Sequence, residues 1–348
     1  MATMKSVRTA DVDKIEVVDV ERPVPGPRVA LVRIRACGIC GTDAAFLHMG
    51  GLPAHGHLGG EIVPVALGHE PAGEVAELGA EVEGLAVGDR VVIDPTGHPS
   101  GLIGCGGTQG AMSEYLLIEN AVAGQNVQVF PDNMPFAVAA LNEPMAVARH
   151  AVNRSQATPD DKVVVFGAGP IGLGAAIWLK LRGVRHVVVA DVIPSRLENA
   201  LAVGADAVVN SAEEDITARL TELHGQAANA LGHPCPGTDI YIDAAGAPAV
   251  LNTVIDNAKW HAKLVMVAVQ KKGEIDLTGM LRSELTLIAS QAYPTEIFEV
   301  TPELAAHQDR FAQLISHRVP FSDVTGAFEL TLTPGAAEKV IVTLDDQP

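Results

Sequence analysis

The chain has 348 residues, a formal net charge of −18, 48% apolar residues and 19% charged residues. This length favours about two domains, and this composition favours a globular fold over a disordered chain. The negative charge argues against nucleic acid and anionic membranes as partners, but it leaves an acidic substrate open because a local pocket can oppose the net charge.

The first half, residues 1 to about 150, contains short β-type runs separated by glycine and proline. These runs read ALVRIRA, GEVAEL, DRVVID and SEYLLI along the chain. Turn signals such as Gly50-Gly51-Leu52-Pro53 lie between them. This pattern predicts a small, barrel-like β domain.

Residues 153–290 instead alternate strand-type and helix-type patterns. A first strand is expected at Val163–Phe166, a helix then continues to about Leu181, and a second strand follows at Val187–Ala190. Such alternation predicts parallel strands joined by right-handed crossovers, which is a doubly wound α/β sheet. The remaining tail predicts one helix over Thr301–Ser316 and a closing strand in KVIVTL.

The first strand of that series ends in a glycine-rich turn, Gly167-Ala-Gly169-Pro170-Ile171-Gly172. Between a strand and a helix, the first glycine allows the tight turn, the second lets backbone approach a pyrophosphate, and the third lets the helix pack close to the sheet. The phosphates would rest on the N–H groups that begin the helix. The turn therefore predicts a dinucleotide site, against the alternative of a βαβ unit that binds no nucleotide.

The second strand ends in Asp191, 19 residues after Gly172. A carboxylate at this place accepts hydrogen bonds from both hydroxyls of an adenosine ribose, whereas it repels a 2′-phosphate. The sequence therefore predicts NAD in preference to NADP. Arg196 tempers this preference because its side chain could turn toward a phosphate.

A second chemical cluster lies in the first half. Cys40 stands in ACGICGTD, His69 and Glu70 follow one another, and Glu143 stands in LNEPMAVARHAV. Thiolate, imidazole and carboxylate suit zinc, and three protein ligands with one exchangeable position is the catalytic arrangement. By spacing alone this zinc site is only a hypothesis, because unrelated chains contain the same residue types.

Several ordered motifs together resemble the zinc-dependent medium-chain dehydrogenases of the alcohol and polyol (sorbitol- and butanediol-like) branch. GHEPAGEVAELGAEV, residues 68–82, is similar to the family's zinc signature, and ACGICGTD, VGDRVV, EPMAVARHAV and GAGPIGLG occur in the family's order. The resemblance implies a GroES-like, β-rich catalytic domain over 1–152 and 291–348. It implies a Rossmann NAD-binding domain over 153–290.

The same resemblance implies roles for single residues. Cys40, His69 and Glu70 match zinc ligands, and Glu143 matches a carboxylate that binds zinc directly or through water. Thr42 matches the hydroxyl that takes the first proton from the substrate. The alternative for Thr42 is a turn hydroxyl bonded to backbone.

Two departures from the family pattern change the expectations. The segment that normally carries four cysteines for a structural zinc has only Cys105 here, so we expect one catalytic zinc and no structural zinc. Ala45 replaces a histidine that passes the proton outward in polyol-type members, so the proton is expected to leave through water or His48.

The predicted function is zinc-dependent hydride transfer between NAD and a small secondary alcohol, diol or polyol, or the reverse reduction of a ketone or aldehyde. The alternatives are a non-catalytic dinucleotide-binding relative and a zinc-free quinone or enoyl reductase.

The sequence predicts a cytoplasmic protein without a membrane partner, because it has four scattered cysteines, no apolar leader and no 18-residue apolar span. The apolar runs KLVMVAV and LTLIAS predict an exposed sheet edge, and the resemblance implies a homodimer or homotetramer formed through it.

Overall fold

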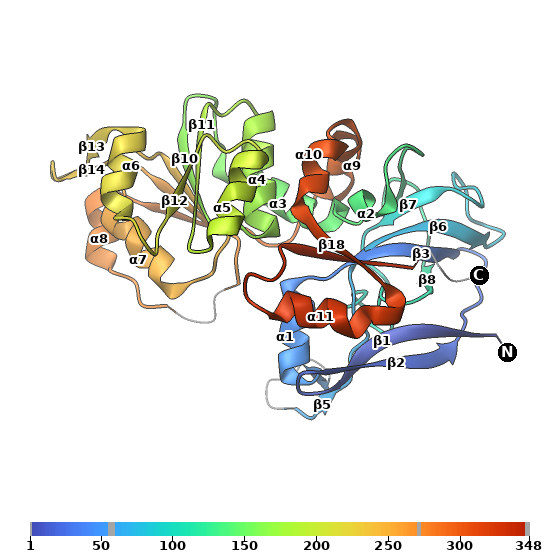
Figure 1. Ribbon diagram of the computed structural model, residues 1–348. Helices are drawn as coiled ribbons and strands as arrows, with labels where there is room; N and C mark the ends of the chain where they lie inside the picture. The colour runs from blue at the N-terminus through green and yellow to red at the C-terminus, as the bar shows by residue number, and fades with distance from the viewer. Residues whose placement is uncertain (1, 55–59, 270–272, 345–348) are drawn as a thin grey trace. The chain divides into compact units, whose positions relative to one another are not determined.

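The computed structural model describes residues 2–54, 60–269 and 273–344, and it divides into two compact units (Figure 1). Unit 1 consists of Met1–Glu143, Ile297–Gln308 and Ile315–Pro348, and unit 2 consists of Pro144–Glu296 and Asp309–Leu314. The domain boundaries at 152/153 and 290/291 stay a prediction.

Unit 1 is built on a seven-stranded sheet with the order β18-β19-β3-β6-β7-β9, and β8 pairs with β3 outside this path. Two further hairpins, β1-β2 and β4-β5, complete its strands. The strands of unit 1 are β1 (Thr3–Asp11), β2 (Lys14–Glu21), β3 (Ala30–Gly38), β4 (Leu52–Pro53), β5 (Ile62–Val63), β6 (Glu70–Leu78), β7 (Arg90–Ile93), β8 (Tyr115–Ile118), β9 (Val127–Val129), β18 (Ile315–Pro320) and β19 (Lys339–Thr343). The β-rich first half is therefore confirmed.

Helices of unit 1 are few and short. They are α1 (Gly41–Met49), α2 (Phe136–Ala139), most of α9 (Glu296–Ala306) and α11 (Val324–Leu332), with a 3-10 turn at Phe321–Asp323. Helix α11 contacts both β18 and β19, and its buried Ala327 and Phe328 join the core formed by β3, β6 and β7. The last part of the chain thus belongs to the same core as the first part.

Strand β3 is central because almost every one of its residues is buried. It lies between β19 and β6, and both pairings are antiparallel. In this register Gly38 is opposite Glu70 on one side and opposite Ile341 on the other. The sheet therefore brings the end of β3, the start of β6 and the start of β19 to one place.

The predicted helix over Thr301–Ser316 is partly wrong. Helix α9 ends at Ala306, the short α10 (Gln308–Phe311) and a 3-10 turn (Ala312–Leu314) follow, and Ile315–Pro320 is strand β18. Strand β18 pairs in parallel with β19, and its Ile315 and Val319 are buried. Tertiary pairing of a segment with apolar β-branched residues has overridden its helical pattern.

Unit 2 contains a six-stranded sheet with the order β12-β11-β10-β15-β16-β17, and every neighbouring pair is parallel. These strands are β10 (Lys162–Phe166), β11 (His186–Asp191), β12 (Ala207–Asn210), β15 (Ile240–Asp243), β16 (Lys263–Met266) and β17 (Thr286–Ala289). A small hairpin, β13 (Gln226–Ala228) with β14 (Pro234–Pro236), stands apart from the sheet. The predicted doubly wound sheet, and with it the mixed α/β fold class, is confirmed.

One helix precedes these strands and others connect them, as Figure 1 shows for α4, α5, α6 and α7. They are α3 (Asn142–Ser155, beginning in unit 1), α4 (Pro170–Leu181), α5 (Pro194–Ala202), α6 (Ile216–His224), α7 (Pro248–Asn257) and α8 (Leu277–Ser283). Val164 and Phe166 of β10 share a core with residues of α6 and α7. Val163 and Val165 are also buried, and alternation along a strand places them on the opposite face of the sheet.

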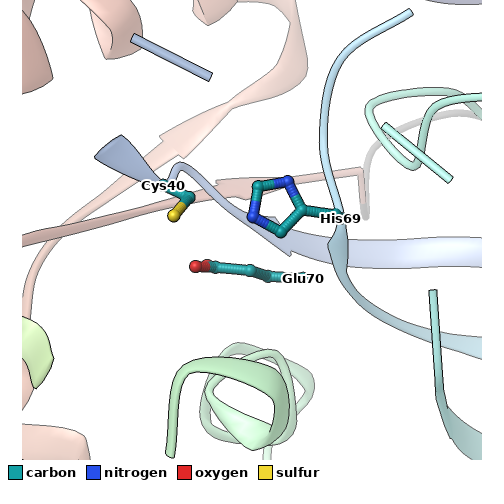
Figure 2. A group of neighbouring side chains, drawn as sticks. All are labelled: Cys40, His69 and Glu70. Atoms are coloured by element: carbon teal, nitrogen blue, oxygen red, sulfur yellow. The ribbon is translucent and has the colours of Figure 1, made fainter. Parts of the chain in front are cut away.

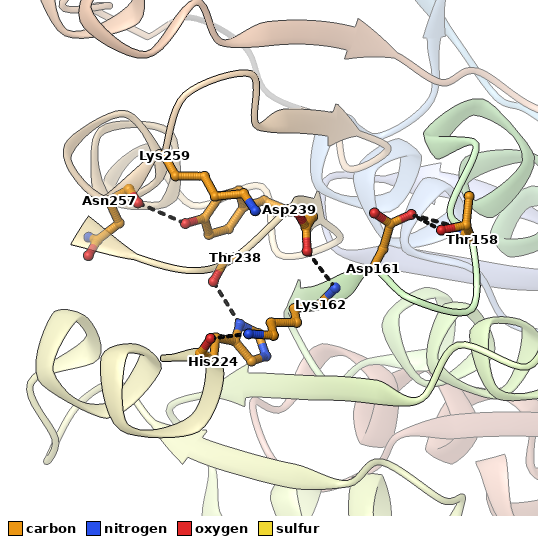
Figure 3. Close-up of polar contacts among 9 residues, drawn as sticks. Thr158, Asp161, Lys162, His224, Thr238, Asp239, Asn257 and Lys259 are labelled. Atoms are coloured by element: carbon orange, nitrogen blue, oxygen red, sulfur yellow. Dashed lines mark hydrogen bonds and ion pairs between the residues drawn. The ribbon is translucent and has the colours of Figure 1, made fainter. Parts of the chain in front are cut away.

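A polar network lies where strands β10 and β15 begin (Figure 3). The backbone N–H of Lys162 donates to Asp239 at 2.8 Å, and Lys259 forms an ion pair with the same carboxylate. The His224 ring contacts the Thr238 hydroxyl at 2.7 Å, and the ammonium of Lys162 donates to the backbone carbonyl of His224. This network closes the amino end of the sheet, which is the end away from the glycine-rich turn.

Among the residues that the structure describes, no helix is both long and apolar enough to cross a membrane.

Candidate functional site

Three of the four predicted metal ligands lie together in unit 1. Cys40, His69 and Glu70 each offer one ligand atom, and these atoms all lie within 4.8 Å of one another. Figure 2 shows the thiol, the imidazole and the carboxylate turned toward a common centre. Their roles as ligands stay a prediction, but their proximity is a property of this fold.

Cys40 is placed by the start of helix α1. It follows the last residues of β3 and is the N-cap of α1, with extended backbone. Its N–H donates to Oδ2 of Asp43 at 2.9 Å, which is one half of a capping box. The cap fixes the direction in which the Cys40 side chain leaves the backbone.

Asp43 also holds the segment that carries His69. Its Oδ1 accepts the N–H of Gly68 at 2.9 Å, and the same oxygen is 3.7 Å from Nδ1 of His69. The carboxyl group is fully buried, so one side chain joins the two loops that bring the thiol and the imidazole.

The imidazole of His69 is almost completely buried. Burial alone would lower the pKa of His69, but the Asp43 carboxylate and the thiols of Cys105 and Cys40 raise it well above its ordinary value. In the absence of a metal, these acidic neighbours favour a cation at this place, whether a proton or a metal ion.

Glu70 is held by a buried lysine from the far end of the sequence. Lys339, the first residue of β19, forms an ion pair with Oε2 of Glu70 and donates to the backbone carbonyl of Ile39 at 2.9 Å. Burial would lower the pKa of Lys339, but the carboxylate of Glu70, followed by Cys40 and Glu143, raises it. The ammonium therefore stays charged beside the candidate ligands.

Gly38 leaves the space that this pair occupies. A Cβ at this position would lie 1.8 Å from Oε2 of Glu70 and 3.0 Å from Cε of Lys339. Any larger residue would displace the carboxylate, so the glycine at the end of β3 is a requirement of the site.

The residues present fit a zinc ion. The donor set is one thiol, one imidazole and one carboxylate, which are the three ligand types that zinc prefers. Oε1 of Glu70 is buried and makes no hydrogen bond with any of the described residues. A buried carboxylate oxygen without a donor is costly, and a bound cation removes that cost.

The other predicted residues of this region lie nearby. Glu143 is half-buried in the first turn of α3, and its charge acts on Lys339. The preceding Asn142 donates to the carbonyl of Ile297 at 2.5 Å and accepts from Thr301 at 2.8 Å, which ties the start of α3 to α9. Glu143 is not part of the three-residue group within 4.8 Å.

Thr42 lies in the first turn of α1, two residues after Cys40, and is half-buried. Ala45 is exposed on the same helix and has no group that transfers a proton. His48, the alternative proton exit, is exposed and contacts Asp13 at 2.5 Å. Water and His48 therefore both remain predicted exits for the proton.

The glycine-rich turn of unit 2 has the geometry that the sequence predicts. Gly167 has φ +93°, which a side chain rarely tolerates, and a Cβ on Gly172 would lie 1.8 Å from the carbonyl oxygen of Gly167. A Cβ on Gly169 would project into open space. The turn thus packs tightly against itself and leaves an unobstructed surface at the start of α4, which fits a pyrophosphate.

Helix α4 begins at Pro170 with Gly169 as its N-cap. By helix geometry the N–H groups of Ile171 and Gly172 have no partner within the helix, and the positive end of the helix dipole adds to them. These are the donors that a phosphate group requires.

Asp191 ends β11 beside this turn. Its Oδ2 accepts the N–H of Ala168 at 2.6 Å, and its Oδ1 accepts the N–H groups of Val192 and Ile193 at 2.7 and 2.9 Å. These bonds hold the carboxylate beside the glycine loop, and one lone pair of Oδ2 remains for a ribose hydroxyl. Arg196 is half-buried in α5, and its Nε makes no hydrogen bond with the described residues.

Sequence reasoning missed Asp43 and Lys339. Asp43 carried a local signal, because an acidic residue three positions after a helix N-cap is typical of a capping box. Lys339 carried none, because a lysine at the start of a C-terminal strand is ordinarily exposed. Only the register of β19 on β3 brings it to Glu70.

Comparisons with known proteins agree with this geometry. The family profile of the alcohol dehydrogenase GroES-like domain matches residues 26–126, and that of the zinc-binding dehydrogenases matches residues 170–306. The chain is 33% identical over 311 residues to (R,R)-butanediol dehydrogenase of Bacillus subtilis, covering 82% of this chain and 83% of that protein. It is 30% identical over 348 residues to human sorbitol dehydrogenase, covering 93% of this chain and 91% of that protein.

Among solved structures, an alcohol dehydrogenase from Escherichia coli in complex with NADH is similar over 99% of this chain and 100% of that chain. The TM-score is 0.82 and the sequence identity is 26%.

Proposed function

Because the chain belongs to the zinc-dependent medium-chain dehydrogenases, we propose that Cys40, His69 and Glu70 hold its catalytic zinc and that hydride passes from a small secondary alcohol, diol or polyol to NAD. The reverse reaction reduces a ketone or aldehyde. The observation that carries this proposal is the convergence of the three ligand types within 4.8 Å in unit 1.

A bound zinc supplies Lewis acidity, which lowers the pKa of an alcohol hydroxyl toward neutrality. Side chains of the protein supply the proton acceptor and hold the ligands in position. The hydroxyl of Thr42 would accept the substrate proton while its own proton passes to water or His48, and Glu143 would bind the zinc directly or through water. Asp43 and Lys339 act as positioning residues, because each joins segments that carry ligands.

In unit 2 the glycine turn holds the pyrophosphate of the cofactor and Asp191 holds the adenosine ribose. We infer a preference for NAD, since three backbone N–H groups, one of them from Ala168 in the glycine loop, hold the Asp191 carboxylate in place. A 2′-phosphate at this place would meet a negative charge.

A homodimer or homotetramer is the proposed assembly. Strand β17 ends the sheet of unit 2, so its outer edge carries unpaired backbone groups. Leu287 on this strand, and Leu277 and Leu281 on the preceding helix α8, are exposed. Light scattering at micromolar concentration tests the assembly, and a strictly monomeric mass would contradict it.

The cytoplasm is the proposed location, in keeping with four free cysteines, and cell fractionation tests it.

The experiment that tests the function is a screen of NADH formation over linear alcohols, vicinal diols and sugar alcohols, with zinc-loaded and zinc-free protein. We expect activity with at least one class, and only with zinc. With substrates of the active class, the Thr42→Val variant should bind zinc normally but oxidise the alcohol about 10²-fold more slowly. Activity on quinones or enoyl compounds without zinc would favour the zinc-free reductase instead.

A further inference from the structure

A cavity of about 520 Å³ lies in unit 1, and the proposed function gives it no role. The hairpin β1–β2 (dark blue in Figure 1) forms one wall, and alternate residues of 113–119, a segment that contains β8, form another. Ser100 and residues 107–110 also line it. The described residues that line the cavity include none of the predicted catalytic residues Cys40, Thr42, His69, Glu70 and Glu143. The cavity is therefore separate from the candidate metal site.

The register of the hairpin explains the first wall. Met4 is opposite Val20, and Ser6 is opposite Val18. Because side chains alternate along a strand, these four lie on one face of the hairpin, and all four line the cavity. Val7 points to the other face and is completely buried in the core of unit 1. The core thus fixes which face of the hairpin meets the cavity.

The second wall is joined to the first. An antiparallel bridge pairs Ser6 with Ser113, and beyond it every second residue lines the cavity, namely Tyr115, Leu117 and Glu119. Tyr115 and Leu117 are only half-buried, so they leave apolar surface beside that of the two valines. A concave space of this volume, lined by apolar and aromatic side chains with a few polar groups, is the usual form of a small-molecule site.

The charges of the lining favour a cation. Its charged residues are Arg8, Glu21 and Glu119. Nε of Arg8 is 2.6 Å from a carboxylate oxygen of Glu16, which offsets the positive charge. Oε2 of Glu119 accepts the N–H of Ser100 at 2.9 Å, whereas Oε1 makes no hydrogen bond with the described part of the chain. The half-buried Glu119 therefore keeps an acceptor for a ligand.

We propose that this cavity is a second small-molecule site, which binds an organic cation composed of an ammonium group and an apolar body. The ammonium group meets the carboxylate of Glu119, and the apolar body lies on Leu117 and Tyr115. The net charge of −18 attracts such a ligand to the protein. The proposal does not depend on the zinc site or on the reaction.

A titration of the full-length protein with benzyltrimethylammonium, followed by saturation-transfer NMR of the ligand, tests the proposal. This cation has an aromatic body, and its nitrogen has no lone pair, so it cannot bind a metal ion. We expect saturable binding with a Kd of about 1 mM or lower. Glu119→Gln keeps the bond to Ser100 but removes the charge, so it should raise the Kd about fivefold. Leu117→Trp fills the cavity and should abolish binding.

The matched controls make the same changes away from the cavity. Glu83→Gln and Leu231→Trp replace exposed residues that do not line it, so the Kd should stay unchanged. Urea unfolding checks that each variant is folded, and if Leu117→Trp is not, Glu119→Gln still decides. No saturable binding by the wild-type protein, or full binding by folded Leu117→Trp, overturns the proposal. An equal Kd for wild-type protein and Glu119→Gln contradicts the assignment of a cation.

Discussion

The metal cluster of unit 1 and the glycine turn of unit 2 are built on opposite principles. The cluster consists of side chains from α1, the start of β6 and the start of β19, and buried polar contacts hold them in place. The turn consists of backbone, and its important residues have no side chain. In the first region we expect the removal of a ligand side chain to abolish function, and in the second we expect the same from a side chain added to a glycine.

The largest expected effect comes from removing a metal ligand. Cys40→Ser should lower kcat/KM for alcohol oxidation by at least about 10³-fold, since Lewis acidity contributes several kcal/mol to the barrier. The affinity for NAD should persist, because the glycine turn belongs to the other unit. Zinc content, NADH formation and NAD affinity are measured side by side, with Cys235→Ser as the control. If metal-free Cys40→Ser oxidised alcohols as fast as the wild-type protein, this would contradict the zinc mechanism.

Lys339→Met tests the buried contacts of the cluster. It leaves the Glu70 carboxylate buried without its cation, which should cost about 3–5 kcal/mol of unfolding free energy in zinc-free protein. Bound zinc should reduce this loss because it neutralises the same carboxylate. Urea unfolding with and without zinc measures both values.

The matched control is Lys259→Met, which breaks a less deeply buried ion pair with Asp239 in unit 2. Bound zinc should not change the loss of unfolding free energy that Lys259→Met causes. If zinc altered both variants equally, Lys339 would not act through the metal cluster.

The two sites differ in how far the sequence alone predicts them. The glycine turn was predictable residue by residue because strand, turn, helix and Asp191 follow one another along the chain. The proximity of Lys339 to Glu70 was not, because it depends on how β19 pairs with β3. The helix expected over Thr301–Ser316 failed for the same reason, since pairing with β19 makes Ile315–Pro320 a strand.

The third prediction concerns pH and unit 2. Burial, followed by the nearby charges of His186 and Lys162, lowers the pKa of His224 to about 4. An unfolded histidine has a pKa of about 6.5, so the unfolded state binds the proton first as the pH falls. The stability that neutral His224 contributes is therefore complete above about pH 6.5 and is lost progressively toward pH 4.

At pH 5 this loss should be about 2 kcal/mol. Urea unfolding at pH 7.5 and pH 5 measures it, and His224→Gln should flatten the difference. Asp239 and Lys259 also face this ring, so Lys259→Met serves as the control for a changed local charge. A wild-type stability that is the same at both values would contradict the assignment.

The smallest predicted effect is cofactor choice. The wild-type protein should prefer NAD over NADP by at least about tenfold in kcat/KM, equivalent to about 1.4 kcal/mol. Asp191→Ser should narrow this preference because it removes the charge that repels a 2′-phosphate. Steady-state kinetics with both cofactors measures this preference. A wild-type preference for NADP would show that Arg196 outweighs Asp191 in the choice of cofactor.

The most direct test of the central claim is a zinc titration of the metal-free wild-type protein, followed by alcohol-dependent NADH formation. Our account predicts that activity is absent without metal, rises in proportion to added zinc and reaches its plateau at one zinc per chain. Full activity without zinc, or a plateau only at two zinc ions per chain, would contradict it.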